Sequence, residues 1–201
     1  FVIDNATKER LCTQDPRSAD LLKPFLEGKD LKRWRAEPRD LWLIYIPKNR
    51  IEIDDYPAIR EWLLPFKDKL EARATKQEWF ELQQAQEAYA PHFAAPKIAY
   101  KDIGDSSPFH VDTEGSFMAN TGYFIPSDEH HLAAYLNSKL LWFTYLNVSA
   151  QIRGGFVRFF SNHLGEMPIP DWPDGAKMEL ATLSERAHAA AKTRLTLQAA
   201  L

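Results

Sequence analysis

The chain has 201 residues, 45% hydrophobic and 26% charged, which is the composition of a soluble globular protein with one substantial core. Its formal net charge of −3 differs from the basic charge that is usual for a dedicated nucleic-acid binder. The single cysteine, Cys12, excludes an internal disulfide and a cysteine-based zinc site, and it fits a reducing cytoplasm.

The sequence was searched for membrane-spanning and targeting segments and for the residue at which it begins. No apolar run is long enough to span a membrane, and no signal peptide is recognisable at the start, so no membrane partner is expected. The sequence begins with Phe1 rather than methionine. We therefore expect it to be a piece of a longer protein.

The first part of the chain combines short extended segments with short helices. Extended segments are predicted around an Asp-Asn turn and in a compact apolar run, at residues 1–13 and 41–46. Helices are predicted from apolar spacing or from a proline at the first helical position, at residues 18–27 up to Pro24, at 57–64 and again after Pro65.

The second part predicts strands, one long helical stretch and a terminal helix. Strands are predicted at residues 96–100, 121–125 and 156–160, with a turn-rich loop over 104–116. Helical spacing is continuous over 130–146 and resumes from about residue 175. The sequence therefore predicts a mixed α/β fold, in which short strands pack with helices around one core over residues 1–173, followed by a long helix over 174–201.

Motifs for catalysis, cofactor binding or metal binding are not found. Methyl transfer to adenine requires an Asn/Asp-Pro-Pro-aromatic motif and a glycine-rich loop for the cofactor, and neither occurs. The acidic group from Glu52 to Asp55 is best explained as an acidic turn before a helix, and the adjacent His130 and His131 point in different directions on a helix. We predict no catalytic, cofactor-binding or metal-binding residues in this chain.

Basic side chains cluster with aromatic residues and glycines at three places. Lysine suits phosphate, whereas arginine and glutamine suit the edges of guanine and adenine. The alternation on the strand at 96–100 favours an exposed position for its lysines, and the glycine pair Gly154–Gly155 lets a loop approach a surface closely. The DNA-contacting candidates are Lys32, Arg33, Lys97, Lys101, Gln151, Arg153 and Arg158.

Several short segments, in a fixed order, resemble the C-terminal target-recognition domain of TaqI-type adenine-specific DNA methyltransferases and of the type IIG restriction–modification enzymes built on them. They begin with the Pro-Phe-Leu-Glu-Gly-Lys-Asp-Leu-Lys-Arg-Trp segment at 24–34 and continue at 41–44, 79–83, 96–98, 120–125, 136–143 and 167–170. The resemblance covers nearly the whole chain.

The resemblance implies a function. Residues 1–173 would recognise double-stranded DNA in the major groove, opposite an upstream methyltransferase domain that binds S-adenosylmethionine and is missing from this sequence. The loop over 150–158 is the first candidate for contacting bases, and the loop over 104–116 is the second. The target sequence is not implied, nor whether the parent enzyme also cleaves DNA.

Two other functions fit the residues. The terminal helix carries a stripe formed by Leu180, Leu183, Ala187, Ala190 and Arg194, through which the chain could act as a protein–protein interaction module. A small enzyme of unknown type is the third hypothesis, although no nucleophile, base and metal ligand set converges in the sequence.

Overall fold

A computed structural model describes residues 1–149, 151–152 and 154–200, which form two compact units. The first unit contains residues 1–25 and 40–91, and the second contains residues 26–39 and 92–201. Residues 26–39 therefore belong to the second unit although the residues on both sides of them belong to the first. This division does not coincide with residue 173, and the terminal helix belongs to the second unit.

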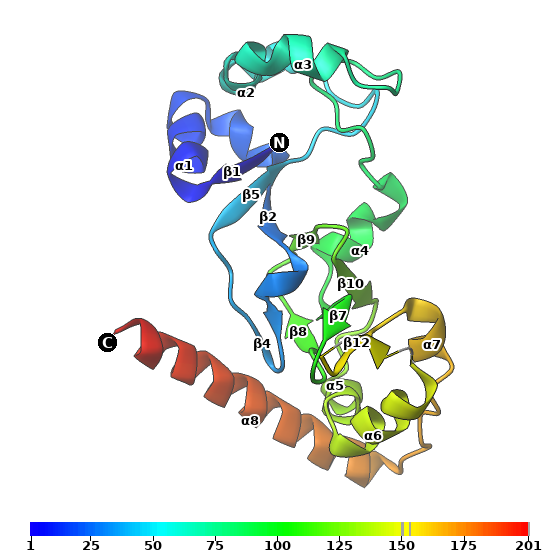
Figure 1. Ribbon diagram of the computed structural model, residues 1–201. Coiled ribbons are helices and arrows are strands. Elements are labelled where there is room, and N and C mark those ends of the chain that lie inside the picture. The colour runs from blue at the N-terminus through cyan, green and yellow to red at the C-terminus, as the bar shows by residue number, and fades with distance from the viewer. Residues whose placement is uncertain (150, 153, 201) are drawn as a thin grey trace. The chain divides into compact units, whose positions relative to one another are not determined.

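The first unit joins an antiparallel sheet to short helices (Figure 1). Strand β5 (Leu41–Ile44) pairs antiparallel with β1 (Val2–Asp4) on one side and with β2 (Leu22–Leu26) on the other. The core collects aliphatic side chains from these strands and from the helices, including the fully buried Ile44 and Ile59. The helices are α1 (Asn5–Gln14), η1 (Pro16–Leu21), η3 (Ile53–Asp55), α2 (Pro57–Leu63), η4 (Leu64–Phe66), α3 (Lys67–Glu71) and η5 (Glu87–Tyr89).

The second unit contains two three-stranded antiparallel sheets and a hairpin. One sheet has the order β10-β6-β8 and the other has the order β11-β12-β7. The strands are β3 (Leu31–Lys32), β4 (Arg35–Ala36), β6 (Lys97–Lys101), β7 (Ile103–Gly104), β8 (His110–Asp112), β9 (Phe117–Met118), β10 (Gly122–Ile125), β11 (Gln151–Ile152) and β12 (Phe156–Arg158).

Helices surround these sheets and complete an aromatic core. The stacked rings of Tyr145 and Phe159 lie at its centre, and both side chains are fully buried. The long helix packs along α5, so that part of its surface is already used within the chain (Figure 1). The helices are η2 (Gly28–Asp30), α4 (Ala90–Ala94), α5 (His130–Leu136), α6 (Lys139–Val148), α7 (Ser161–Gly165) and α8 (Asp174–Ala199).

The mixed α/β class and the long C-terminal helix are confirmed, whereas several local predictions are wrong. The segment predicted as extended over 1–13 is mostly helix α1, because the Asp4 carboxylate accepts the Thr7 N–H at 2.8 Å and caps the helix. The helical patch predicted over 18–27 becomes a strand at Leu22, and Pro24 lies in that strand opposite Trp42.

Two predictions in the second unit also need correction. The continuous helix expected over 130–146 is two helices, because Ser138 caps α6 by accepting the Leu141 N–H at 3.0 Å. The turn-rich loop over 104–116 contains the strand β8.

The buried side of α8 differs from the stripe expected from apolar residues alone. Ser184 is fully buried, whereas Leu183 is 49% exposed. The half-buried Leu180, Ala187 and His188 lie on the same side as Ser184, so the small serine is the most deeply buried residue where α8 packs against the rest of the unit. Within the described ranges, no helix combines the length and the apolar character that crossing a bilayer requires.

Candidate functional site

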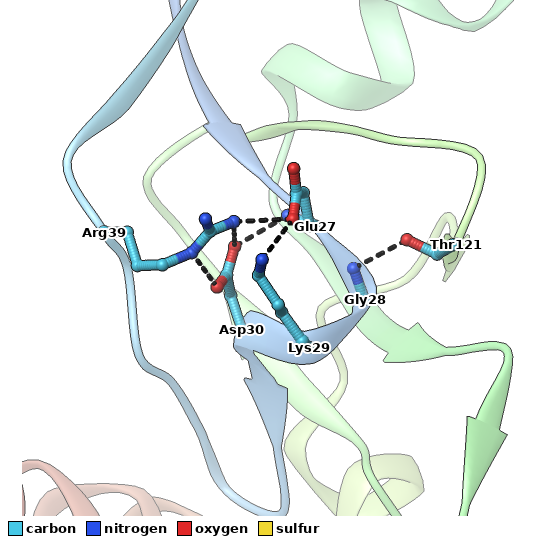
Figure 2. A network of polar contacts seen from close by, with 6 residues as sticks. All are labelled: Glu27, Gly28, Lys29, Asp30, Arg39 and Thr121. Atoms are coloured by element: carbon cyan, nitrogen blue, oxygen red, sulfur yellow. Dashed lines mark hydrogen bonds and ion pairs between the residues drawn. The ribbon is translucent and has the colours of Figure 1, made fainter. Parts of the chain in front are cut away.

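A network of charges holds the segment that leads into the hairpin β3–β4 (Figure 2). Asp30 is only 2% exposed, and its carboxylate accepts the Glu27 N–H at 2.8 Å and the Arg39 Nε–H at 2.8 Å. Arg39 also lies 2.7 Å from the Glu27 carboxylate, which Lys29 approaches to 3.0 Å from another side. The Lys29 hydrogen bond and then the charge of Arg39 lower the pKa of Glu27, despite an opposing effect of desolvation. The network fixes both ends of the hairpin segment.

Gly28 is the one position in this network where a side chain cannot fit. Its N–H donates to the Thr121 hydroxyl at 2.9 Å (Figure 2). A Cβ at Gly28 would stand 2.3 Å from the Thr121 carbonyl oxygen, which is backbone and cannot rotate away. Glycine is therefore required for this close approach.

The tip of the hairpin is tied to the core of the second unit. Trp34 has a φ of 68°, and its N–H donates to the Phe109 carbonyl at 3.0 Å. The Asn137 side chain bonds both backbone groups of Phe109, and the Asn137 carbonyl accepts a hydrogen bond from Arg33. Arg33 is exposed, but one of its N–H groups is already committed to this structural contact.

Loss of the Asp30 carboxylate is expected to loosen the hairpin. In Asp30→Ala the half-buried Glu27 N–H and the Arg39 guanidinium lose the buried carboxylate that accepts from them, which should lower the free energy of unfolding by about 2–3 kcal/mol. Urea denaturation measures this change. Lys29→Ala is the matched control, since it removes only an exposed ion pair and should change stability by less than about 1 kcal/mol. Equal effects of the two substitutions would contradict the structural role of Asp30.

Two lysines predicted to contact DNA lie close together in the second unit. Lys101 ends β6, and its stem packs against Gly104, where a Cβ would meet the lysine Cε at 3.0 Å. Burial lowers the pKa of Lys101, and the positive charge of Lys32 lowers it further, although Asp105 opposes this. Within the described part of the chain, neither lysine takes part in an ion pair. Such a pair of like charges is stabilised by an anion placed between them.

Lys97 does not lie on an exposed face, and this prediction is wrong. Its side chain is fully buried and forms an ion pair with Asp112, while its ammonium also donates to the Phe93 carbonyl at 2.7 Å. Strand β6 lies between β10 and β8 and is covered on both faces, so alternation does not produce a solvent side. Lys97 is a structural residue here.

The hairpin β11–β12 contains the remaining predicted base-contacting residues. Gln151 lies opposite Val157, whereas Phe156 lies opposite Ile152. Residues that face each other across strands share a face, and neighbours along a strand alternate, so Gln151 and Arg158 lie on opposite faces of the hairpin. Gln151 is exposed, and the Arg158 guanidinium lies 5.4 Å from the centre of the Phe160 ring. Arg153 lies outside the described residues.

The turn of this hairpin depends on its two glycines. Gly154 and Gly155 have φ values of 88° and 81°, in the left-handed region that other residues rarely adopt. Gly155 has open space where a side chain would be, so its conformation rather than crowding selects glycine. The backbone conformation at both positions therefore favours glycine.

A cavity of about 670 Å³ lies between α8, the hairpin β3–β4 and β8, and the sequence did not predict it. Its walls include Trp34 and the imidazoles of His110, His130 and His188, and the His188 ring lies 5.3–5.5 Å from the other three rings. These residues are far apart in the sequence, and only the fold brings them together. Among the described residues, no group of three or more potential ligands could hold a metal ion.

Comparison with known proteins gives a consistent set of matches. A model of the TaqI-like C-terminal specificity domain matches residues 23–169. The type II methyltransferase M.PaeR7I of Pseudomonas aeruginosa is 29% identical over 147 residues, which cover 65% of this chain and 24% of that protein. The chain thus spans about a quarter of the length of this relative.

A solved structure shares the fold. It is the type IIL restriction–modification enzyme MmeI in complex with DNA, which superposes with a TM-score of 0.59 at 15% sequence identity. The match covers 98% of this chain and 26% of that one. Both units of the chain are therefore included in the shared fold.

Proposed function

Because the chain belongs to the family of TaqI-like C-terminal specificity domains, we propose that it recognises a specific sequence in double-stranded DNA for an attached methyltransferase. The observation that carries the proposal is the match of the specificity-domain model to residues 23–169, to which the structure adds the pair Lys32 and Lys101, neither of which forms an ion pair in the described chain. Lysine ammonium groups of this kind suit DNA phosphates. The relatives named for methylation and for a complex with DNA support the proposal.

The proposal assigns contacts with DNA phosphates and contacts with DNA bases to different residues. Lys32 and Lys101 bind phosphate and set the position of the domain, because such contacts carry no sequence information. The hairpin β11–β12 contacts base edges, since a two-stranded ribbon fits the major groove. The net charge of −3 does not oppose this arrangement, because only the local charge near the phosphates matters at short range.

The activity of the parent protein is part of the same proposal. A separate upstream domain would bind S-adenosylmethionine and transfer its methyl group to adenine in the bacterial or archaeal cytoplasm. The specificity domain contributes DNA affinity and the choice of site. Whether the parent also cleaves DNA does not affect this role.

Substitution of the two lysines should weaken binding to all DNA sequences alike. In the full-length parent protein, Lys32→Ala or Lys101→Ala is expected to reduce the slope of log Kd against log salt concentration by about 1 per lysine, because one phosphate contact is lost. Fluorescence anisotropy with a selected duplex and a scrambled duplex, at several salt concentrations, measures both quantities.

The control for this experiment is Lys69→Ala, which removes an exposed lysine of α3 in the other unit. It should leave the slope unchanged. If random-duplex selection with the full-length protein yields no preferred sequence, the proposed function is wrong. If a preferred sequence is found but both lysine variants keep the wild-type slope, the phosphate-contacting role of the pair is wrong.

A further inference from the structure

One face of the sheet β11-β12-β7 carries apolar side chains that remain exposed. Phe156 is 39% exposed and Ile103 is 38% exposed, although both belong to β-strands. Ile152 is half-buried beside them. Apolar side chains grouped on one exposed face indicate a binding surface more often than isolated ones do.

The strand register places these residues together. Ile152 lies opposite Phe156, and Ile103 lies opposite Arg158. Phe156 and Arg158 are two positions apart on β12, so their side chains share a face. Val157, between them, is fully buried on the other face and lies opposite Gly104. The exposed face is therefore defined by Ile103, Ile152, Phe156 and Arg158, and we call it the ribbon face.

The surroundings of the ribbon face favour DNA over a protein partner. Its one charged member is Arg158, whose guanidinium is held over the Phe160 ring rather than by a carboxylate. Lys101 packs where a Gly104 side chain would lie, on the side of β7 opposite Ile103, so Lys101 lies behind this face and not on it. A surface that combines apolar groups with an arginine held only over an aromatic ring complements the major groove, where phosphates flank the base edges.

One group in the major groove is apolar. The 5-methyl group of thymine projects into it, and apolar side chains such as phenylalanine recognise it. Gly154 and Gly155 carry no side chain, so these two positions do not hinder the approach of the ribbon to the bases. A two-stranded ribbon fits the major groove.

We propose that the ribbon face contacts thymine methyl groups in the major groove, with Phe156 and Ile103 as the residues that determine this specificity. The inference rests on the proposed function, and it adds the chemical group that is recognised. Arg158 supplies a polar contact beside the methyl groups. The recognised site therefore contains at least one thymine whose methyl group contributes to affinity.

Replacement of thymine by uracil tests the proposal, because it removes only the methyl group. Each thymine in the duplex selected by the full-length protein is replaced in turn, and Kd is measured for every duplex. We expect Kd to rise about fourfold at one or more positions, which is the effect of burying one methyl group. In Phe156→Ser or Ile103→Ser, which leave no methyl group on the side chain, the ratio of Kd for uracil to Kd for thymine should fall to about one at such a position.

Two controls separate this effect from others. Val2→Ser makes the same kind of change at an apolar strand residue that is 45% exposed in the other unit, and it should keep the wild-type ratio. Lys32→Ala should weaken binding to both duplexes equally. Circular dichroism and thermal unfolding show whether each variant is folded.

The outcomes are distinct. Wild-type protein that prefers a site but does not distinguish thymine from uracil at any position overturns the inference and leaves the proposed function intact. An undiminished ratio in folded variants of the ribbon face also overturns it, as does a loss of association with the catalytic domain without a change in the ratio. Absence of any preferred site overturns the proposed function itself.

Discussion

Asp112→Ala is expected to lower the free energy of unfolding by about 3–5 kcal/mol, because it leaves the buried Lys97 ammonium without its counter-charge. Lys97 is fully buried and Asp112 is 2% exposed. The carboxylate also accepts the N–H groups of Glu114 and Ser116, each at 3.0 Å, so it organises the turn that follows β8. Urea denaturation followed by tryptophan fluorescence measures the loss.

Removal of both charges separates the ion pair from the hydrogen bonds of the turn. Lys97→Met with Asp112→Asn leaves no buried charge and retains an acceptor for the turn, so it should destabilise the protein less than Asp112→Ala does. Arg17→Ala, which breaks an ion pair with a 58% exposed arginine side chain, is the control and should cost less than about 1 kcal/mol. An equally large loss in the double variant would mean that packing, rather than charge, dominates at this position.

The position of Lys97 illustrates what the sequence alone could not decide. Alternation along Lys97–Lys101 suggests one polar and one apolar face, but this inference holds only for a strand with a solvent side. Strand β6 has neighbours on both edges and is covered on both faces, and no local pattern reveals that. Lys101, at the end of the same strand, is half-buried rather than fully buried. The two lysines therefore differ in role although their local sequences are similar.

Ordered motifs were more informative than local periodicity. The segment at 24–34 predicted the family, and the match over residues 23–169 confirms it. The structure explains the segment physically, since Gly28 allows contact with Thr121 and Asp30 anchors Arg39. By contrast, helix α1 and the break before Lys139 depend on single capping residues, Asp4 and Ser138. A prediction based on the spacing of apolar residues does not take such single residues into account.

Sites formed by distant residues could be predicted only in part. The glycine pair predicted a loop over 150–158, whereas the structure pairs β11 with β12 on either side of the glycines. The ribbon face also needs Ile103, which joins it through the pairing of β7 with β12, and that pairing has no signature in the sequence. The same reason explains why Gln151 and Arg158 were grouped together although the register places them on opposite faces.

The histidines that line the cavity should make the second unit sensitive to acid. Burial lowers the pKa of His110 to about 4, helped by the charge of His188 and of Lys97, although Asp112 and the Trp34 backbone oppose it. Burial also lowers the pKa of His188, and His130 adds to this while the Ser184 backbone opposes it.

The neutral His188 ring accepts the Val111 N–H at Nε2 (3.1 Å), so the Nδ1 atom, 2.8 Å from the Ser184 carbonyl oxygen, carries the proton. A protonated ring could not accept from Val111, and α8 would lose this link to β8.

The direction of the pH effect follows from the lowered pKa values. A folded pKa below the unfolded value of 6.5 means that the unfolded chain binds protons more readily, so stability is full above pH 6.5 and declines as the pH falls toward 4. The contribution of His110 across this window is about 3 kcal/mol. Urea denaturation between pH 7.5 and 5.0 measures most of it above the range in which carboxylates titrate. His110→Gln, which is neutral throughout, should show a flatter pH dependence, and a slope equal to that of the wild type would assign the acid sensitivity to other groups.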